Sequence, residues 1–372
     1  MAQKFSPSRL NVARLRRGYT RKALAEAVRM NERTLRAYET GAMPPSDDAL
    51  AAIARELRFP IDFFFRSDIE MALPDGASFR ALSKITARER DAALAGGALA
   101  FELNAWIDAR FSLPPVDVPE LRPETDPEAA ALAVRTHWSL GDGPVSNMVH
   151  LLEAKGVRVY SLAEDVETVD AFSLWNNDHP FVFLNTLKSA EHSRFDAAHE
   201  LAHLVLHRHG GPSGQQAEYD ANKFASAFLM PKTGLLESVA RNATLEYLVK
   251  AKLPWRVSLA ALVHRMNDIG MISEWYYKTL SVEIQRRGYR RREPKPLPRE
   301  HSQVLAKVFA MLKEHEHVTR SDVAAQLGWP VDELNALIFQ LALSGLPADR
   351  PKRKGKIEPK PPTEPPLLRL ID

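Results

Sequence analysis

The stretch "AAHELAHLVLH", from Ala197 to His207, decides how the centre of this chain is interpreted. On a helix, His199 and His203 are four residues apart and lie on one face, so both imidazoles can reach one metal ion. Glu200 lies next to that face, where its carboxylate can accept a proton from a water molecule, and the arrangement is the H-E-x-x-H motif. The alternative is a buried amphipathic helix that happens to contain histidines. The apolar residues around the motif predict burial, and buried histidines without partners would be costly, which favours a metal site.

The third metal ligand is expected on the next helix. Two histidines leave tetrahedral zinc short of a protein ligand, and the sequence has no cysteine to supply one. The stretch "AEYDANKFASAFLMP" offers Glu218, with Asn222 one turn further along and able to hydrogen-bond a ligand. Asp220 is the rival carboxylate, and it points about 200° away from Glu218 on the helix. We favour Glu218.

Other polar residues near the motif are harder to assign. His207 continues the histidine face by one turn and His209 lies just beyond, but their nitrogens would lie about 5 Å or more further along the helix axis. We therefore expect His207 to support a ligand or to end the helix, not to bind the metal. Tyr219 and His179 are both candidates for stabilising an oxyanion, and His192 is expected to be exposed to solvent.

Two motifs together resemble a known family. "FDAAHELAHLVLH" followed by "EYDANKFASAFLMP" is similar to the ImmA/IrrE family of bacterial and phage zinc metallopeptidases, and the flanking "PFVFLN" and "SLAALVHRMNDIG" extend the resemblance over residues 140 to 275. The resemblance implies a zinc cofactor, His199, His203 and Glu218 as ligands, and Glu200 as general base. It also implies that the substrate is a repressor or related regulator, cleaved in a stress response or in the control of mobile elements.

The N-terminal region, residues 6 to 66, is predicted to be four or five short helices. Within it, "TRKALAEAVRMNERTLRAYETG", residues 20 to 41, has a helix-turn-helix layout and resembles the Cro and phage-repressor type of DNA-binding domain, the XRE family. The internal contacts would come from Leu24, Ala25, Val28, Met30, Leu35 and Tyr38. The residues expected to face double-stranded DNA are Arg21, Lys22, Asn31, Arg33, Thr34 and Arg36.

Two features of this region bear on DNA binding. Arg33, Thr34 and Arg36 belong to the helix that would enter the major groove, with Arg21 and Lys22 nearer to phosphates. At the turn, Arg29 stands where the pattern generally carries glycine with positive φ, which for arginine costs on the order of 1 kcal/mol. A slightly different turn is an equal alternative and would re-aim the recognition helix. A small helical protein-interaction module with a solvated basic face is the alternative.

The rest of the chain predicts a multidomain, mainly α protein. Strands are expected at residues 157–162, 169–175 and 180–185, before a helix from about Arg194 to Arg208. The expected domains are a helix-turn-helix domain at 1–68, a helical linker region at 69–126, an α+β zincin-like metallopeptidase domain with a small sheet at 127–280, a C-terminal helical region, comparable to a winged helix, at 281–346, and a disordered tail rich in Pro and Lys at 347–372.

The C-terminal region contains a second helix-turn-helix-like stretch, residues 318 to 343. A second DNA-binding unit is one interpretation. We favour packing or dimerisation, because the second helix shows Leu334, Leu337, Ile338 and Leu341 but few outward basic residues.

Composition narrows the class of protein. There is no run of about eighteen apolar residues and no signal-peptide core at the N-terminus, so we expect a cytoplasmic protein without a membrane partner. The net charge is only +3, yet arginines and lysines cluster in the first forty residues. Paired half-sites in this type of DNA recognition suggest a homodimer.

These observations support two hypotheses of different classes. The first is a DNA-binding transcription regulator whose zinc peptidase domain cleaves a repressor or the chain itself. The second is a transcription factor whose peptidase-like domain is a non-catalytic sensor of a ligand, metal or partner, or an antitoxin-like binding protein. The intact Glu200 favours the first, because a site kept only for structure needs no general base.

Overall fold

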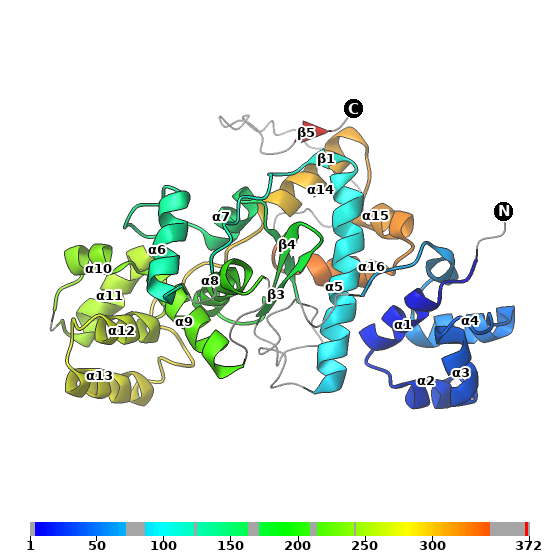
Figure 1. The fold of residues 1–372 in the computed structure, drawn as a ribbon, viewed down its shortest axis with the longest axis horizontal. Helices are drawn as coiled ribbons and strands as arrows, with labels where there is room; N and C mark the ends of the chain where they lie inside the picture. Colours follow the sequence, from blue (N-terminus) through cyan, green and yellow to red (C-terminus); the bar gives the residue numbers. More distant parts are fainter. Residues whose placement is uncertain are drawn as a thin grey trace, which may run out of the picture.

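The computed structural model describes residues 4–71, 86–122, 125–162, 171–208, 214–241, 243–342 and 369–370. In this part of the chain, 16 α-helices surround one three-stranded mixed sheet, which confirms the predicted multidomain, mainly α class. The N-terminal helices lie at one end of the molecule, the sheet lies near the centre, and a group of four helices lies at the other end (Figure 1). Among the described helices, none is long and apolar enough to cross a membrane.

The N-terminal region is built from short helices that begin at polar caps. Its elements are α1 (Pro7–Arg16), α2 (Arg21–Ala27), α3 (Glu32–Glu39), α4 (Asp47–Leu57) and the 3₁₀ helix η1 (Ile61–Phe65). The side chains of Ser6, Thr20, Asn31 and Ser46 each accept a backbone N–H from the first turn that follows. Such caps satisfy N–H groups that have no partner inside the helix, so they determine where each helix starts.

The turn between α2 and α3 has one of the geometries that the sequence allowed. Leu24 and Leu35 are fully buried, and Ala25 and Tyr38 are nearly so, while Val28 and Met30 are partly buried against the same core. Arg29 adopts φ +54°, so the structure has the left-handed turn and not the different turn that the sequence left open. The fold therefore tolerates a non-glycine residue at this turn.

A single long helix, α5 (Ala87–Asp108), stands between the N-terminal helices and the central sheet (Figure 1). It begins at a capping box formed by Thr86 and Glu89. The short strand β1 (Phe111–Ser112) follows and pairs antiparallel with β5 (Arg369–Leu370). Residues 343–368, 371 and 372, which include nearly all of the predicted disordered tail, lie outside the described part.

The central region combines the sheet with the helices that cover it. Its elements are α6 (Pro127–His137), α7 (Met148–Ala154), β2 (Arg158–Ser161), β3 (Ala171–Asn176), β4 (His179–Leu184), α8 (Ala190–Leu206) and α9 (Gln215–Leu229). In the strand order β2-β4-β3, β4 runs parallel to β2 and antiparallel to β3. Helix α8 packs on β3 and β4, and α9 packs against α8.

Helix α8 begins at Ala190, four residues before the predicted start at about Arg194. The reason is Ser189, whose side chain accepts a hydrogen bond from the backbone N–H of His192. The three strands lie where the sequence predicted them, within two residues at each end.

The remaining helices form two groups. The first group is α10 (Lys232–Ser238), α11 (Leu245–Trp255), α12 (Leu259–Asp268) and α13 (Glu274–Arg286), and the second is α14 (Gln303–His315), α15 (Arg320–Leu327) and α16 (Val331–Ile338). Two buried carboxylates join the second group to the centre. Glu153 at the end of α7 accepts N–H groups from Gln303 and Val304 of α14, and Glu300 accepts those of Met148 and Val149 of α7.

The C-terminal helices also hold the N-terminal region. The carboxylate of Glu333 on α16 is buried and pairs with two arginines at the end of α1. One oxygen lies 2.7 Å from Nε of Arg16, the last residue of α1, and the other pairs with Arg17, its C-cap. Nearby, Glu102 of α5 accepts hydrogen bonds from Arg9 of α1 and from the indole of Trp329. We refer to these two carboxylates and their partners as the α1–α16 contact. It agrees with the packing role favoured for the C-terminal helices.

Candidate metal centre

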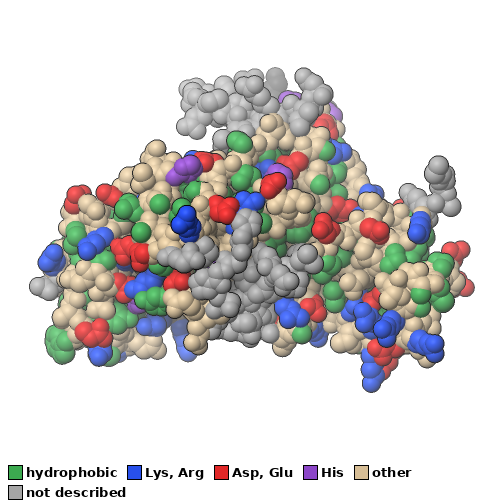
Figure 2. Space-filling model, viewed as in Figure 1, with side chains coloured by type: hydrophobic (Ala, Val, Ile, Leu, Met, Phe, Trp, Pro, Cys, Tyr) green, Lys and Arg blue, Asp and Glu red, His purple; other side chains and the backbone are tan. Residues whose placement is uncertain are grey.

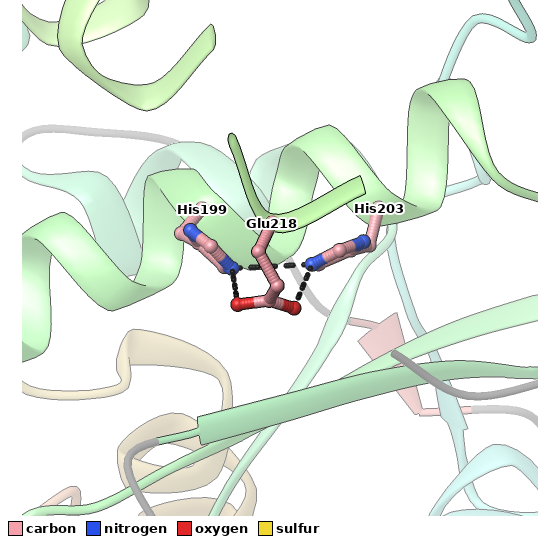
Figure 3. Close-up of side chains that lie close together, drawn as sticks. All are labelled: His199, His203 and Glu218. Atoms are coloured by element: carbon pink, nitrogen blue, oxygen red, sulfur yellow. Dashed lines mark hydrogen bonds and ion pairs between the residues drawn. The ribbon is translucent and has the colours of Figure 1, made fainter. Parts of the chain in front are cut away.

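Helices α8 and α9 bring His199, His203 and Glu218 together (Figure 3). The two Nε2 atoms lie 3.1 Å apart, and the Glu218 carboxylate lies across them, with Oε2 at 3.6 Å from His199 Nε2 and Oε1 at 3.5 Å from His203 Nε2. These ligand atoms all lie within 4.8 Å of one another. The helical spacing supplies the two histidines, and the packing of α9 on α8 supplies the carboxylate.

The rival ligand lies elsewhere. Asp220 accepts a hydrogen bond of 2.8 Å from Gln216 on the same helix and is not part of the cluster. The cluster is largely shielded from solvent, with side-chain exposures of 12% for His199, 6% for His203 and 26% for Glu218. Glu218 is the most accessible of the three side chains.

The outer nitrogen of each histidine has a partner. His199 Nδ1 lies 3.3 Å from Asn222 Oδ1, and the amide nitrogen of Asn222 donates to the Glu218 carbonyl at 2.8 Å. An amide oxygen only accepts, so His199 Nδ1 carries the proton and its Nε2 presents a lone pair to the cluster. Burial lowers the pKa of His199, which favours this neutral form.

His207 is the hydrogen-bond partner of the outer nitrogen of His203. The two Nδ1 atoms lie 2.9 Å apart, so one of them must donate and the other accept. If His203 Nε2 presents a lone pair to the cluster, its Nδ1 is the donor. Burial lowers the pKa of His207 to about 4, which keeps the acceptor ring neutral. His209 lies outside the described residues.

Glu200, which follows His199 on α8, is buried and is held by the sheet. Its Oε2 accepts a hydrogen bond of 2.7 Å from Ser173 Oγ on β3, and the same hydroxyl lies 3.2 Å from the Glu200 carbonyl oxygen. Sequence reasoning missed Ser173. The available signal was a single hydroxyl within the apolar strand "VDAFSLW", because a buried hydroxyl requires a partner.

A cavity of about 580 Å³ adjoins the cluster. Asn222, which contacts His199, lines it, together with Tyr219 and His192. Tyr219 is exposed, as is His192, which is consistent with the expectation for that histidine. His179, the other candidate for oxyanion stabilisation, is not among the lining residues. A volume of about 580 Å³ lies in the range typical of ligand-binding pockets.

The candidate DNA-binding residues lie on α2 and α3, where Lys and Arg side chains gather in the lower right of Figure 2. Lys22, Arg33 and Arg36 are exposed, and Thr34 is half-buried. Asn31 is exposed but already accepts the Arg33 N–H as the cap of α3, and Arg21 pairs with Glu39.

Part of the clustered N-terminal charge is used within the protein. Arg14 pairs with Glu39, and Arg16 and Arg17 pair with Glu333. The local excess of arginine seen in the sequence therefore overstates the charge available to DNA. The exposed cations of α2 and α3 remain.

Comparison with protein families agrees with both halves of this description. Residues 152–267 match the IrrE N-terminal-like domain of a peptidase family, and residues 11–64 match a helix-turn-helix domain. No curated protein sequence matches the chain. The chain therefore combines an XRE-type helix-turn-helix domain with an IrrE/ImmA-like peptidase domain, in that order.

Proposed function

We propose that this protein is a cytoplasmic DNA-binding transcription regulator whose peptidase domain hydrolyses a peptide bond in a regulatory protein, either a repressor or the chain itself. Control of a stress response or of a mobile element is the proposed setting. The observation that carries the proposal is the convergence of His199, His203 and Glu218 beside the buried carboxylate of Glu200, in a chain that also has a helix-turn-helix domain.

Zinc fits the residues that are present. Two imidazole nitrogens and a carboxylate oxygen form a set of three protein ligands typical of catalytic zinc sites. The hydrogen bond from His199 to Asn222 directs a nitrogen lone pair into the cluster, and the carboxylate adds negative charge there. Such a set of electron-rich atoms is stabilised by a shared cation. His199, His203 and Glu218 would hold the ion.

The chain's own residues then determine the chemistry. Bound zinc supplies polarisation of a water molecule and of the scissile carbonyl. Glu200 accepts the proton of the attacking water and transfers it to the leaving amine. The Ser173 hydroxyl holds the Glu200 carboxylate in one orientation through its 2.7 Å hydrogen bond. Asn222 and His207 fix the orientation of the two imidazoles.

The DNA-binding half of the proposal rests on α3. This helix would enter the major groove with Arg33, Thr34 and Arg36, and Arg21 and Lys22 would contact phosphates. Asn31 would act at the start of the helix. Binding to paired half-sites would require a homodimer.

The first test is the zinc content of the purified protein, measured by mass spectrometry. We expect about one zinc per chain in the wild type and a loss in both His199→Ala and Glu218→Ala, because two ligands seldom retain zinc. The matched control is Asp220→Ala, which removes a carboxylate from the same helix but not from the cluster, and should keep its zinc. Wild-type protein that takes up no zinc after supplementation would rule out the peptidase.

A second measurement distinguishes a metal ligand from a residue that only orients a ligand. We expect His207→Ala to retain the site but to weaken zinc affinity about 10- to 100-fold, because His203 loses the acceptor that orients it. Competition with a chelator of known affinity measures this change. The control is His264→Ala, which removes an exposed histidine of α12 outside the cluster. Equal affinity in His207→Ala and wild type would show that His207 has no orienting role.

A further inference from the structure

Among the described residues, most charged side chains that line the cavity beside the cluster form ion pairs, and one does not. It is bounded by the start of α8, by α9, by α12 and by the segment after α13, and the charged residues that line it are Glu191, Lys223, Asp268, Arg290 and Glu293. Whether the cavity favours an acidic or a basic substrate depends on which of these charges are already neutralised.

The three carboxylates have cationic partners within the protein. Glu191 and Glu293 share Lys252, which is completely buried behind the cavity wall, at 3.4 and 3.1 Å. Asp268 pairs with Lys223 at 3.1 Å and lies 3.3 Å from His264 Nδ1. Each of the three carboxylates therefore already has a cationic partner within the protein.

One oxygen of each of the two carboxylates that share one lysine also accepts a backbone N–H. Glu191 accepts the N–H of Leu297 at 2.8 Å, and Glu293 accepts the N–H of Leu259 at 2.7 Å. Glu191 lies in the first turn of α8, and Leu259 is the first residue of α12, so both carboxylates face the positive end of a helix dipole. Burial also raises the pKa of Glu293 above its ordinary value.

Arg290 is the exception. Its side chain is exposed at the cavity, and among the described residues it has no ion pair, nor do the exposed Arg291 and Arg292 that follow it. Phe195, Ala260 and Ala261 contribute apolar surface to the same cavity. The cavity thus offers apolar contacts together with a guanidinium that can bind a carboxylate through two parallel hydrogen bonds.

We propose that this cavity is the substrate subsite of the peptidase and that Arg290 recognises a carboxylate of the substrate peptide, a few residues from the scissile bond. The inference rests on the proposed function, because a substrate subsite presupposes that the domain is a peptidase. The carboxylate belongs either to an acidic side chain or to the C-terminus of the peptide, and the chemistry of recognition is the same for both.

The test measures peptide binding, so it does not depend on cleavage. The full-length Glu200→Gln protein, loaded with zinc, is incubated with a pool of random octapeptides, and the retained peptides are identified by mass spectrometry. One pool carries free C-termini and a second carries C-terminal amides. We expect retained peptides to be enriched in Asp and Glu in both pools if a side chain is recognised, and retention only in the free pool if the terminus is recognised.

Charge reversal identifies the residue responsible. Arg290→Glu should reduce retention of the carboxylate-bearing peptides about tenfold, the typical effect of losing one charge-assisted hydrogen-bonded pair, and Arg290→Lys should restore part of it. Arg241→Glu, at an exposed arginine outside the cavity, is the control and should leave retention unchanged.

The outcomes distinguish the inference from the proposed function. Retention without any preference for carboxylates, or an Arg290→Glu protein that binds like its parent, would overturn the inference while leaving the peptidase intact. Carboxylate-dependent retention by a protein whose wild-type form cleaves nothing would support the inference as a binding site and contradict the peptidase.

Discussion

Replacing Glu200 by glutamine is expected to reduce peptide cleavage by about 10²- to 10⁴-fold while leaving the zinc content unchanged. Glutamine has nearly the same shape and can still accept the hydrogen bond from Ser173, so the local structure should survive. It cannot accept the proton of the attacking water. The measurement is the rate of product formation from a random octapeptide pool, followed by mass spectrometry at saturating zinc.

The control for this prediction is Glu237→Gln, which removes the charge of an exposed glutamate on α10 and should cleave at the wild-type rate. If Glu200→Gln cleaves as fast as wild type, another group is the general base. If wild-type protein binds zinc and DNA but cleaves no partner, the domain is a sensor and not an enzyme.

The second large effect is expected far from the metal centre, at Glu333. Removing this carboxylate leaves Arg16 buried without its counter-ion, and breaking a buried pair on one side typically costs roughly 3–5 kcal/mol. We therefore expect Glu333→Ala to open the α1–α16 contact. Hydrogen exchange of the amides of α1 and α16 measures the local free energy of opening, which suits a multidomain chain better than one global unfolding curve.

Two variants sharpen this experiment. Glu333→Gln keeps an acceptor for Arg16 and should lose less protection than Glu333→Ala, which separates the loss of charge from the loss of volume. Glu314→Ala removes an exposed glutamate of α14 and should change the free energy by no more than about 0.5 kcal/mol. Unchanged protection of α1 in Glu333→Ala would mean that the ion pairs do not hold the N-terminal region in place.

Local patterns were sufficient to predict much of the fold and the cluster. The four-residue spacing of His199 and His203 places both on one face of any helix. Helical geometry showed that Glu218 and Asp220 cannot both face the metal. The helix-turn-helix pattern placed Arg29 at the turn, but it left open whether Arg29 adopts positive φ or the turn differs, and the structure shows positive φ. The error at the start of α8 came from overlooking Ser189 as a cap.

The features that could not be predicted depend on contacts distant in sequence. Ser173 meets Glu200 only because β3 lies against α8, and the cavity forms only where α8, α9, α12 and the segment containing Arg290 converge. Glu333 and Arg16 are more than 300 positions apart. The cluster of positive charge in the sequence indicated DNA as a partner. It could not indicate which arginines form ion pairs with carboxylates of the protein itself.

The α1–α16 contact determines what a cut in the chain would achieve. Hydrolysis of a bond between residues 71 and 86 would break the covalent connection, yet Glu333 and Glu102 would still hold arginines that lie on the other side of the break. The fragments would run separately on a denaturing gel and elute together under native conditions, with α3 still in place. Cleavage in cis would thus release DNA only if a second event displaced a buried carboxylate, whereas cleavage of a separate repressor needs no such event.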